Sequence, residues 1–590
     1  MLNEKEFFDR VYACWMGKNI GGTLGGPLEG RMELMDIKGY TQSFISAVEN
    51  DDLDLQLVNL HCVEQNGGRA DVQLLSREWL DHVHFEFDEY GHAMTNMRRG
   101  LGAPLSGHYN NFFTDCMGSP IRSEIWAVIC AGMPDLAAYY AYHDASVDHA
   151  GGEGVYGEIF FAVLESLAFE EQDKFKLIHA ALAYLPETSE VRQAVELLLD
   201  CHGKGLSWVE ARQQIIDRFA GDNFTYAPVN IAFTLVGWLY EEGFTRQMLT
   251  TINCGYDTDC TVATLGSLLG ILYGTSYLDA YWTEPLGENI VVSRPITGFD
   301  APKTISELTQ RSIEARKLVQ AHYEQQADKS VYKIPYQAKV ETYDLPLGAF
   351  KHHDLKLEME YEDGCPAFAP GEKKILRLKV RNLQKIPQTL VFCPQADGFV
   401  CSKAEMELAG GEEKTAEVVL EAPEAKQPLY RGQMEIRRII NGVYWNSDFV
   451  PMTLLPSMDW RVELDGVEKA LALKENRIAL KDMGEAAQKS LKFATDLWLI
   501  DAGSSVLKLA CKNPLTAKLD GETIIDCAEE TIVIPAYHRA DSRKCAEINA
   551  APGKHHLEIE IRDPQQFTEL YFMVVSNDLY WAYRLDAVFA

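Results

Sequence analysis

The chain has 590 residues, and 55 basic against 87 acidic side chains give it a net charge of −32 and a pI near 4.9. This length predicts two to four domains, and the acidic balance argues against nucleic acid or a membrane as partner. Thirteen cysteines without a Cys-x-x-Cys pair, together with a start unlike a signal peptide, predict reduced thiols and a cytoplasmic location.

The first predicted element is an amphipathic helix that Asn3 can cap and whose apolar stripe ends at Trp15. It runs into a glycine-rich stretch, Gly17–Gly30, that matches neither a phosphate loop nor a dinucleotide fingerprint. Because glycine has no side chain, this stretch predicts a helix that packs closely against another and then turns sharply. The Glu29 carboxylate would then lie at the rim of whatever site lies beneath.

Two acidic segments stand where later helices are expected to begin. Asn50–Asp52 precedes a helix-spaced apolar face, and Asp257–Cys260 precedes a run that is apolar on nearly every side. Either segment alone favours ordinary helix capping. Four converging carboxylates, however, repel one another unless a cation lies between them, and oxygen ligands suit Mg²⁺, Mn²⁺ or Ca²⁺. Taken together with the glycine-rich stretch, the two segments favour a site for a hard metal ion.

Helical periodicity dominates up to about residue 330. Beyond the helices above, the predicted helices span 71–84, 135–142, 155–169, 187–202, 208–219, 229–241 and 304–327. Later segments alternate apolar and polar residues with a period of two, as in Leu355–Tyr361, which predicts strands. The block to about Pro456 predicts an Ig-like antiparallel sandwich. The last block predicts a second sandwich, with a hairpin turn at Asp520-Gly521.

In this order the first three motifs resemble the ADP-ribosylglycohydrolase family. Its Gly-x-x-x-Gly…Leu-Gly-x-Pro-x-Glu segment, its Thr-Asp-Asp triplet and its Gly-Gly-Asp-Thr-Asp-Thr motif correspond to Gly17–Glu29, Asn50–Asp52 and Gly255–Cys260. Its middle loop and its His-bearing segment resemble Met117–Arg122 and Asp144–Gly157. The resemblance covers roughly the first half of the chain.

The resemblance and the change of periodicity near residue 330 together predict a multidomain architecture. Residues 1–330 would form an all-α orthogonal helix bundle that carries the catalytic site, followed by two all-β sandwich domains at 331–456 and 457–590. The last domain resembles a galactose-binding-like jelly roll in its strand rhythm and its Pro535–Arg539 loop. A structural or oligomerisation role is favoured for it over sugar binding, and two accessory sandwiches favour a homodimer.

The resemblance also implies a set of site residues. The metal ligands would be Asn50, Asp51, Asp52, Asp257, Asp259 and Cys260. The substrate-binding residues would be Gly118, Ser119, Arg122, His149 and Tyr156. The catalytic residues would be Glu29, Asp52 and Asp257, with Glu29 activating water or contacting a ribose. The implied cofactor is one or two Mg²⁺ ions, with Mn²⁺ as the alternative. For Arg122, a structural ion pair with Glu124 or a cleft carboxylate stays an equal alternative.

The chain departs from the family pattern at three positions. Asn50 and Cys260 stand where the family usually has Thr, and Met117 stands where ADP-ribose-specific members have Asn. A thiol is a poor ligand for a hard cation. We therefore expect one firm site, built from Asp51, Asp52 and Asp259 with the amide oxygen of Asn50, and a weaker one that depends on Asp257 and Cys260.

Three functions follow as hypotheses. The leading one is a metal-dependent hydrolase of an ADP-ribosyl or related N- or O-ribosyl bond, acting on a small molecule or an ADP-ribosylated target. The second is a hydrolase of nucleosides or other small glycosides on the same fold, and metal-free chemistry with two carboxylates stays open for both. The third is a non-catalytic binding or structural protein of the crystallin type, which the retained aspartates argue against.

Overall fold

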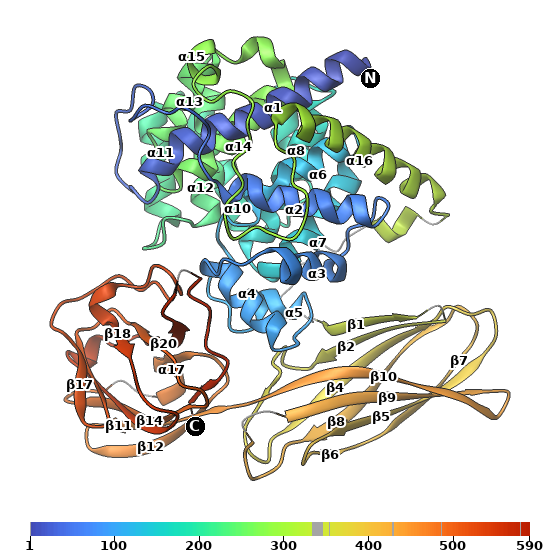
Figure 1. Ribbon diagram of the computed structural model, residues 1–590, viewed down its shortest axis with the longest axis vertical. Helices are drawn as coiled ribbons and strands as arrows, with labels where there is room; N and C mark the ends of the chain where they lie inside the picture. The colour runs from blue at the N-terminus through green and yellow to red at the C-terminus, as the bar shows by residue number, and fades with distance from the viewer. Residues whose placement is uncertain are drawn as a thin grey trace. The chain divides into compact units, whose positions relative to one another are not determined.

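The computed structural model describes residues 2–327, 329–332, 346–352, 354–427, 430–484, 487–578 and 580–589. The chain forms two compact units, one comprising Met1–His84 and Phe113–Glu341, the other Phe85–Phe112 and Thr342–Ala590. The first unit is helical and the second is rich in β-structure (Figure 1). The predicted order, a helical domain followed by antiparallel sheets, is confirmed. The sequence predicts the junction near residue 330, and residues 333–345, just after it, lie outside the described residues.

The helical unit contains helices of different lengths, among them those that the periodicity predicts. They are α1 (Glu4–Gly25), α2 (Asp51–Gln65), α3 (Val72–His82), α6 (Ser123–Ile129), α7 (Pro134–Asp148), α8 (Glu153–Ala168), α9 (Lys174–Leu182), α10 (Glu190–Gly203), α11 (Trp208–Phe219), α12 (Ala227–Tyr240), α13 (Phe244–Ile252), α14 (Thr258–Tyr273), α15 (Ala280–Thr283) and α16 (Ile305–Gln325). In the described part of the chain, none of the helices combines the length and apolarity that a membrane crossing requires.

Helices α1 and α14 cross at very short range, as the glycine-rich stretch predicts. The close pairs along the crossing are Gly17 with Gly266, Gly21 with Ala263, and Gly25 with Asp259. A Cβ atom on Gly25 would lie 2.3 Å from the Cα of Asp259, closer than real Cβ atoms come to backbone. The missing side chains therefore let the backbones touch. This crossing brings the end of α1 to the start of α14, where the second acidic segment lies.

Residues 85–112 form α4 (Asp88–Arg98) and α5 (Leu105–His108) and belong to the second unit, although the sequence placed them in the helical domain. The Pro535–Arg539 loop packs on them. The Tyr537 hydroxyl lies 3.3 Å from the Nδ1 of His92, and the Nε of Arg539 lies 3.0 Å from an oxygen of Asp88. This loop is therefore committed to contacts within its own unit, which fits a structural role.

The β-strands that the structure describes in the second unit form four sheets. The first is β1 (Pro346–His352), β2 (Leu355–Tyr361), β4 (Lys373–Asn382), β8 (Glu413–Glu421) and β6 (Val400–Cys401). The second is β3 (Ala367–Phe368), β10 (Val443–Pro456), β9 (Tyr430–Ile440), β5 (Gln388–Ala396) and β7 (Ala404–Leu408). The third is β12 (Val467–Leu473), β11 (Met458–Leu464), β14 (Leu491–Leu499), β19 (Gly553–Ile561), β16 (Leu515–Leu519) and β17 (Glu522–Cys527), with β21 (Ala587–Phe589) on β14. The fourth is β13 (Arg477–Ala479), β20 (Glu569–Ser576), β15 (Ser505–Ala510) and β18 (Cys545–Ile548).

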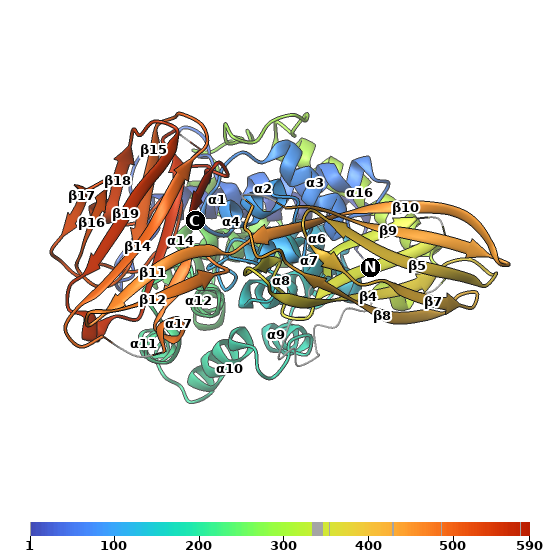
Figure 2. The same cartoon turned by 90° about the horizontal axis from the view of Figure 1, so that it is seen from below.

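Local patterns in these sheets agree with the sequence. In β2 every second side chain is buried, from Leu355 to Tyr361. Asp520 and Gly521 both adopt positive φ, 52° and 85°, and connect β16 to β17 as the predicted two-residue hairpin turn. The strands of the third sheet run side by side in Figure 2. The more specific Ig-like and jelly-roll folds, and the domain boundaries at 330 and 456, stay predictions.

A candidate metal centre at the ends of α1, α2 and α14

Two motifs far apart in the sequence form one rim. The short helix η1 (Gly26–Leu28) follows α1 and leaves the Glu29 side chain exposed. The backbone N–H of Gly30 donates to the carbonyl of Tyr256 at 3.0 Å, and the N–H of Tyr256 donates to the carbonyl of Arg31 at 2.7 Å. Gly255 has φ +74°, and a Cβ there would lie 2.5 Å from the Arg31 oxygen. This backbone pairing holds Glu29 beside the start of α14.

The carboxylates converge in two groups that share Asp259. Asp52, Asp259 and Cys260 place one ligand atom each within 4.8 Å of one another, and so do Glu29, Asp257 and Asp259. The Oδ1 atom of Asp259 is buried, and it has no hydrogen-bond partner among the residues that the structure describes. A buried acceptor without a donor is costly unless a cation or a proton satisfies it. The donor set therefore fits a divalent ion.

For Asn50 and Asp51, metal binding stays a prediction. Asn50 is the N-cap of α2, and its side-chain oxygen accepts the Asp52 N–H at 2.8 Å. Gly22 leaves room for this cap, because a Cβ there would lie 1.7 Å from the Asn50 amide nitrogen. Asp51 belongs to neither group within the described part of the chain. Cys260 lies with Asp52 in one group and Asp257 lies with Glu29 in the other, but Asp257 also acts on the Cys260 thiol, so the expected partition of ligands stays a prediction.

Burial and mutual repulsion set the protonation of the centre. Burial, and after it the neighbouring carboxylates, raise the pKa of both Asp257 and Asp259 well above the usual range. Burial also raises the pKa of the Cys260 thiol, and the charges of Asp257 and Asp259 raise it further. The thiol is therefore neutral, and its Sγ donates to an oxygen of Asp52 at 3.5 Å. When these carboxyl groups are ionised, the centre carries an excess of negative charge that a divalent cation would relieve.

Sequence reasoning missed a buried cation behind this centre. The Nζ of Lys18 lies 3.4 Å from Asp52 and 2.8 Å from Glu124, and all three side chains are fully buried. Burial lowers the pKa of Lys18, but the charges of Glu124 and Asp52 outweigh it and raise that pKa above the usual range. Lys18 lies three residues after Trp15, on the same face of α1. A lysine on the buried stripe of a helix is the signal that could have found it.

Arg122 pairs with aspartates rather than with Glu124. Its two terminal nitrogens each lie 2.9 Å from an oxygen of Asp148, and its Nε donates to Asp144 at 3.2 Å. His149 contacts Asp148 through Nδ1 at 3.0 Å. All four of these side chains are fully buried. They form one ion-pair network that connects η2 (Pro120–Arg122) to the end of α7.

The remaining residues predicted to bind substrate lie around this network. The carbonyl of Gly118 accepts from Arg122 at 2.8 Å, and Ser119 is buried. Gly154 packs on His149, because a Cβ there would lie 2.3 Å from the imidazole. Tyr156 is partly exposed. Their contact with a substrate stays a prediction.

Fold and site together define a helical protein with a buried carboxylate cluster at the ends of three helices. The chain belongs to the ADP-ribosylglycohydrolase family, whose model matches residues 3–326. Membership of this family points to glycohydrolase activity, and the family is usually metal-dependent. No curated protein matches the chain.

Solved structures give only distant similarities. An "ADP-ribosylglycohydrolase-related protein complex" is 19% identical, with a TM-score of 0.38, over 54% of this chain and 99% of that one. An "anti-sigma factor domain-containing protein" is 10% identical, with a TM-score of 0.17, over 35% of this chain and 80% of that one. The GAE domain of GGA2p from Saccharomyces cerevisiae is 15% identical, with a TM-score of 0.15, over 18% of this chain and 96% of that one.

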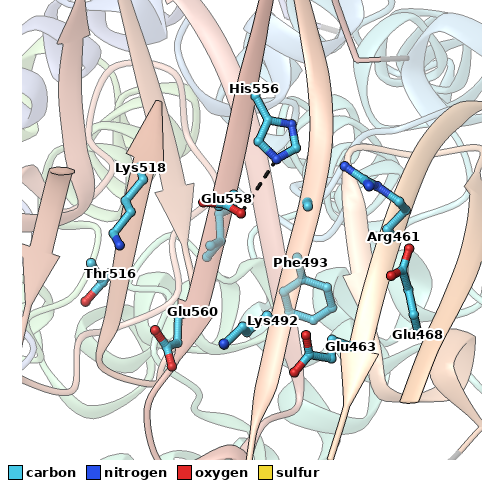
Figure 3. Close-up of a pocket in the computed structure, with 12 residues that line it drawn as sticks. Arg461, Glu463, Glu468, Lys492, Phe493, Thr516, Lys518, His556, Glu558 and Glu560 are labelled. Atoms are coloured by element: carbon cyan, nitrogen blue, oxygen red, sulfur yellow. Dashed lines mark ion pairs between the residues drawn. The ribbon is translucent and has the colours of Figure 1, made fainter. Parts of the chain in front are cut away.

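A pocket of about 250 Å³ lies on the third sheet of the second unit (Figure 3). Charged side chains of both signs line it, among them Arg461, Lys492, Glu558 and Glu560. The phenyl ring in its lining, that of Phe493, is fully buried, and the other ring is the imidazole of His556. Small-molecule sites are mostly apolar and aromatic with few polar groups. This lining does not favour a sugar site and agrees with a structural role for the sheet.

Proposed function

We propose that this protein is a divalent-metal-dependent hydrolase of an ADP-ribosyl or related N- or O-ribosyl bond. The observation that carries the proposal is the pair of acidic groups that share Asp259, one of whose oxygens is buried without a partner among the described residues. One group ends in a neutral thiol and the other in the exposed Glu29. Oxygen donors of this kind suit Mg²⁺ or Mn²⁺.

Each side chain has a distinct task in this proposal. Asp52, Asp257 and Asp259 would hold the ion. When bound there, a divalent ion supplies a site for vicinal hydroxyls and a bound water of lowered pKa. Glu29 is the exposed carboxylate of the cluster, so it can reach solvent and accept a proton from an attacking water. Lys18, behind Asp52, offsets part of the negative charge and fixes the orientation of that carboxylate.

The charge of the cluster fits the reaction. Cleavage of a ribosyl bond passes through a transition state with positive charge at the anomeric carbon. Carboxylates that are already in place stabilise this charge without reorganising. The rim formed by Glu29 and Tyr256 is where a ribose would approach, because the other acidic side chains lie deeper.

A substrate screen tests the proposal. Purified protein is supplied with Mg²⁺ or Mn²⁺ and incubated with ADP-ribosylated protein, O-acetyl-ADP-ribose, nucleosides and aryl glycosides, and the products are read by mass spectrometry. We expect metal-dependent release from an ADP-ribosyl substrate, which Glu29→Gln abolishes. Glu33→Gln is the matched control, because Glu33 is an exposed carboxylate of the same loop outside both acidic groups. Turnover of nucleosides or aryl glycosides alone would move the assignment to small glycosides.

A further inference from the structure

A second cluster of metal-ligating side chains lies in the helical unit. His61 on α2 and Glu78 and His82 on α3 place one ligand atom each within 4.8 Å of one another. The Nδ1 of His61 lies 2.7 Å from the Oε2 of Glu78, and the Nε2 of His82 lies 3.4 Å from the same oxygen. Their side chains are 17%, 11% and 12% exposed, so an ion could enter from solvent.

The contacts of the two ring nitrogens of His82 fit a cation beside it. Its Nδ1 lies 2.8 Å from the backbone carbonyl of Thr297, and since a carbonyl only accepts, this nitrogen carries the proton. In the neutral imidazole the Nε2 atom is then an acceptor, yet it faces the carboxylate of Glu78, also an acceptor. Two acceptors cannot satisfy each other. A cation beside the Nε2 of His82, either a metal ion or a proton, would satisfy both acceptors. A backbone carbonyl that accepts from the other ring nitrogen is a common support of a metal-bound histidine.

The loop after α15 holds this arrangement in place. Residues 82–84 pair with residues 295–297 through two backbone hydrogen bonds. The N–H of Thr297 donates to the carbonyl of His82 at 3.1 Å, and the N–H of His84 donates to the carbonyl of Pro295 at 3.1 Å. Gly298, at φ +90°, allows the close approach, because a Cβ there would lie 2.8 Å from the Nδ1 of His82. The Phe299 ring packs on both imidazoles, with centroids 4.9 and 5.1 Å away.

We propose that His61, Glu78 and His82 bind a Zn²⁺ ion, with a fourth position open to water. Two imidazoles and one carboxylate are a donor set that zinc accepts in tetrahedral sites. Glu78 and His82 are four residues apart on α3 and therefore share a face. This site is separate from the acidic centre, because His61 lies nine residues beyond Asp52 on α2, roughly 13 Å along the helix. The ion would fasten α3 to α2, the helix that presents Asp52.

The test is a titration of metal-free protein with Zn²⁺, in excess Mg²⁺, for wild type, Glu78→Gln, His82→Ala and the control His179→Ala. His179 is an exposed histidine in the last turn of α9. We expect one zinc-binding event in wild type and in the control. The zinc affinity of Glu78→Gln and of His82→Ala should be at least tenfold to a hundredfold lower, since even the loss of a supporting partner has that effect. Glu78→Gln preserves side-chain size, so it reports on the site even if His82→Ala does not fold.

The absorption spectrum of bound Co²⁺ distinguishes metal binding at this site from metal binding by the thirteen cysteines. Co²⁺ bound by nitrogen and oxygen lacks the intense thiolate charge-transfer band, so the difference spectrum between wild type and His82→Ala should show ligand-field bands without it. Equal zinc affinity in wild type, Glu78→Gln and His82→Ala would overturn the proposal. A melting temperature that rises on acidification in wild type but not in His82→Ala, with no response to Zn²⁺, would show that a proton joins His82 to Glu78 and would also overturn it.

Discussion

Replacing Gly25 by Ala tests whether the crossing of α1 and α14 positions the acidic centre. The new Cβ would lie 2.3 Å from the Cα and 2.4 Å from the backbone nitrogen of Asp259, and backbone cannot move aside as a flexible side chain could. Overpacking of this kind typically costs about 1–3 kcal/mol, which exceeds the gain of up to about 1 kcal/mol from replacing a helical glycine by alanine. We expect net destabilisation of the helical unit and a displaced Asp259, with weaker Mg²⁺ binding.

Gly26 is the matched control. It is the next residue, it has helical backbone angles, and a Cβ there would meet nothing within 4 Å. Gly26→Ala should be neutral or slightly stabilising, by less than about 1 kcal/mol. Thermal unfolding with and without Mg²⁺ and calorimetric titration with Mg²⁺ measure both effects. If Gly25→Ala and Gly26→Ala bind Mg²⁺ equally well and melt at the same temperature, the crossing does not position the acidic centre.

Three further predictions concern the same centre. Because the pKa values of Asp257 and Asp259 are raised, their ionisation weakens the folded state as pH rises above the usual Asp range, and Mg²⁺ relieves this. The Mg²⁺-induced rise in melting temperature should therefore grow from about pH 5 to about pH 8, and a shift independent of pH would contradict this. Lys18→Met leaves two buried carboxylates without their cation and should lower the free energy of unfolding, measured with denaturant, by about 3–5 kcal/mol. Lys38→Met, at an exposed ion pair, should lower it by less than about 1 kcal/mol. Equal losses would show that the buried ion pair contributes no more to stability than the exposed one. Cys260→Thr replaces a neutral thiol by a hydroxyl and should tighten Mg²⁺ binding in calorimetry, and unchanged binding would show that this position does not limit the metal.

The sequence predicted those features that depend on local pattern. The spacing of glycines indicated a close helix crossing, and Gly17 and Gly25 both lie in that crossing. The alternation of buried and exposed side chains in β2 and the Asp520-Gly521 turn could also be predicted, because period-two burial and positive φ both have direct sequence signatures. The convergence of the two acidic segments followed from their resemblance to a family and not from spacing alone.

Features that depend on long-range packing could not be predicted from the sequence. Lys18 lies on the buried stripe of α1, but which carboxylates it pairs with depends on how α2 and α6 pack against that helix. The grouping of Cys260 with Asp52 depends on how α14 is rotated against α2. Residues 85–112 join the second unit through pairs such as Asp88 with Arg539, 451 residues apart in the sequence. Contacts of that separation leave no periodic signal.

One measurement tests the central claim most directly. Wild-type protein and Asp259→Asn are stripped with a chelator, and hydrolysis of an ADP-ribosyl substrate is followed as Mg²⁺ is returned without other metals. Asp259 belongs to both acidic groups, so its loss should remove both. We predict that stripped wild type is inactive and recovers with Mg²⁺, whereas Asp259→Asn stays inactive at every Mg²⁺ concentration. Full activity of the stripped wild type, or recovery of Asp259→Asn to the wild-type rate, would contradict the account.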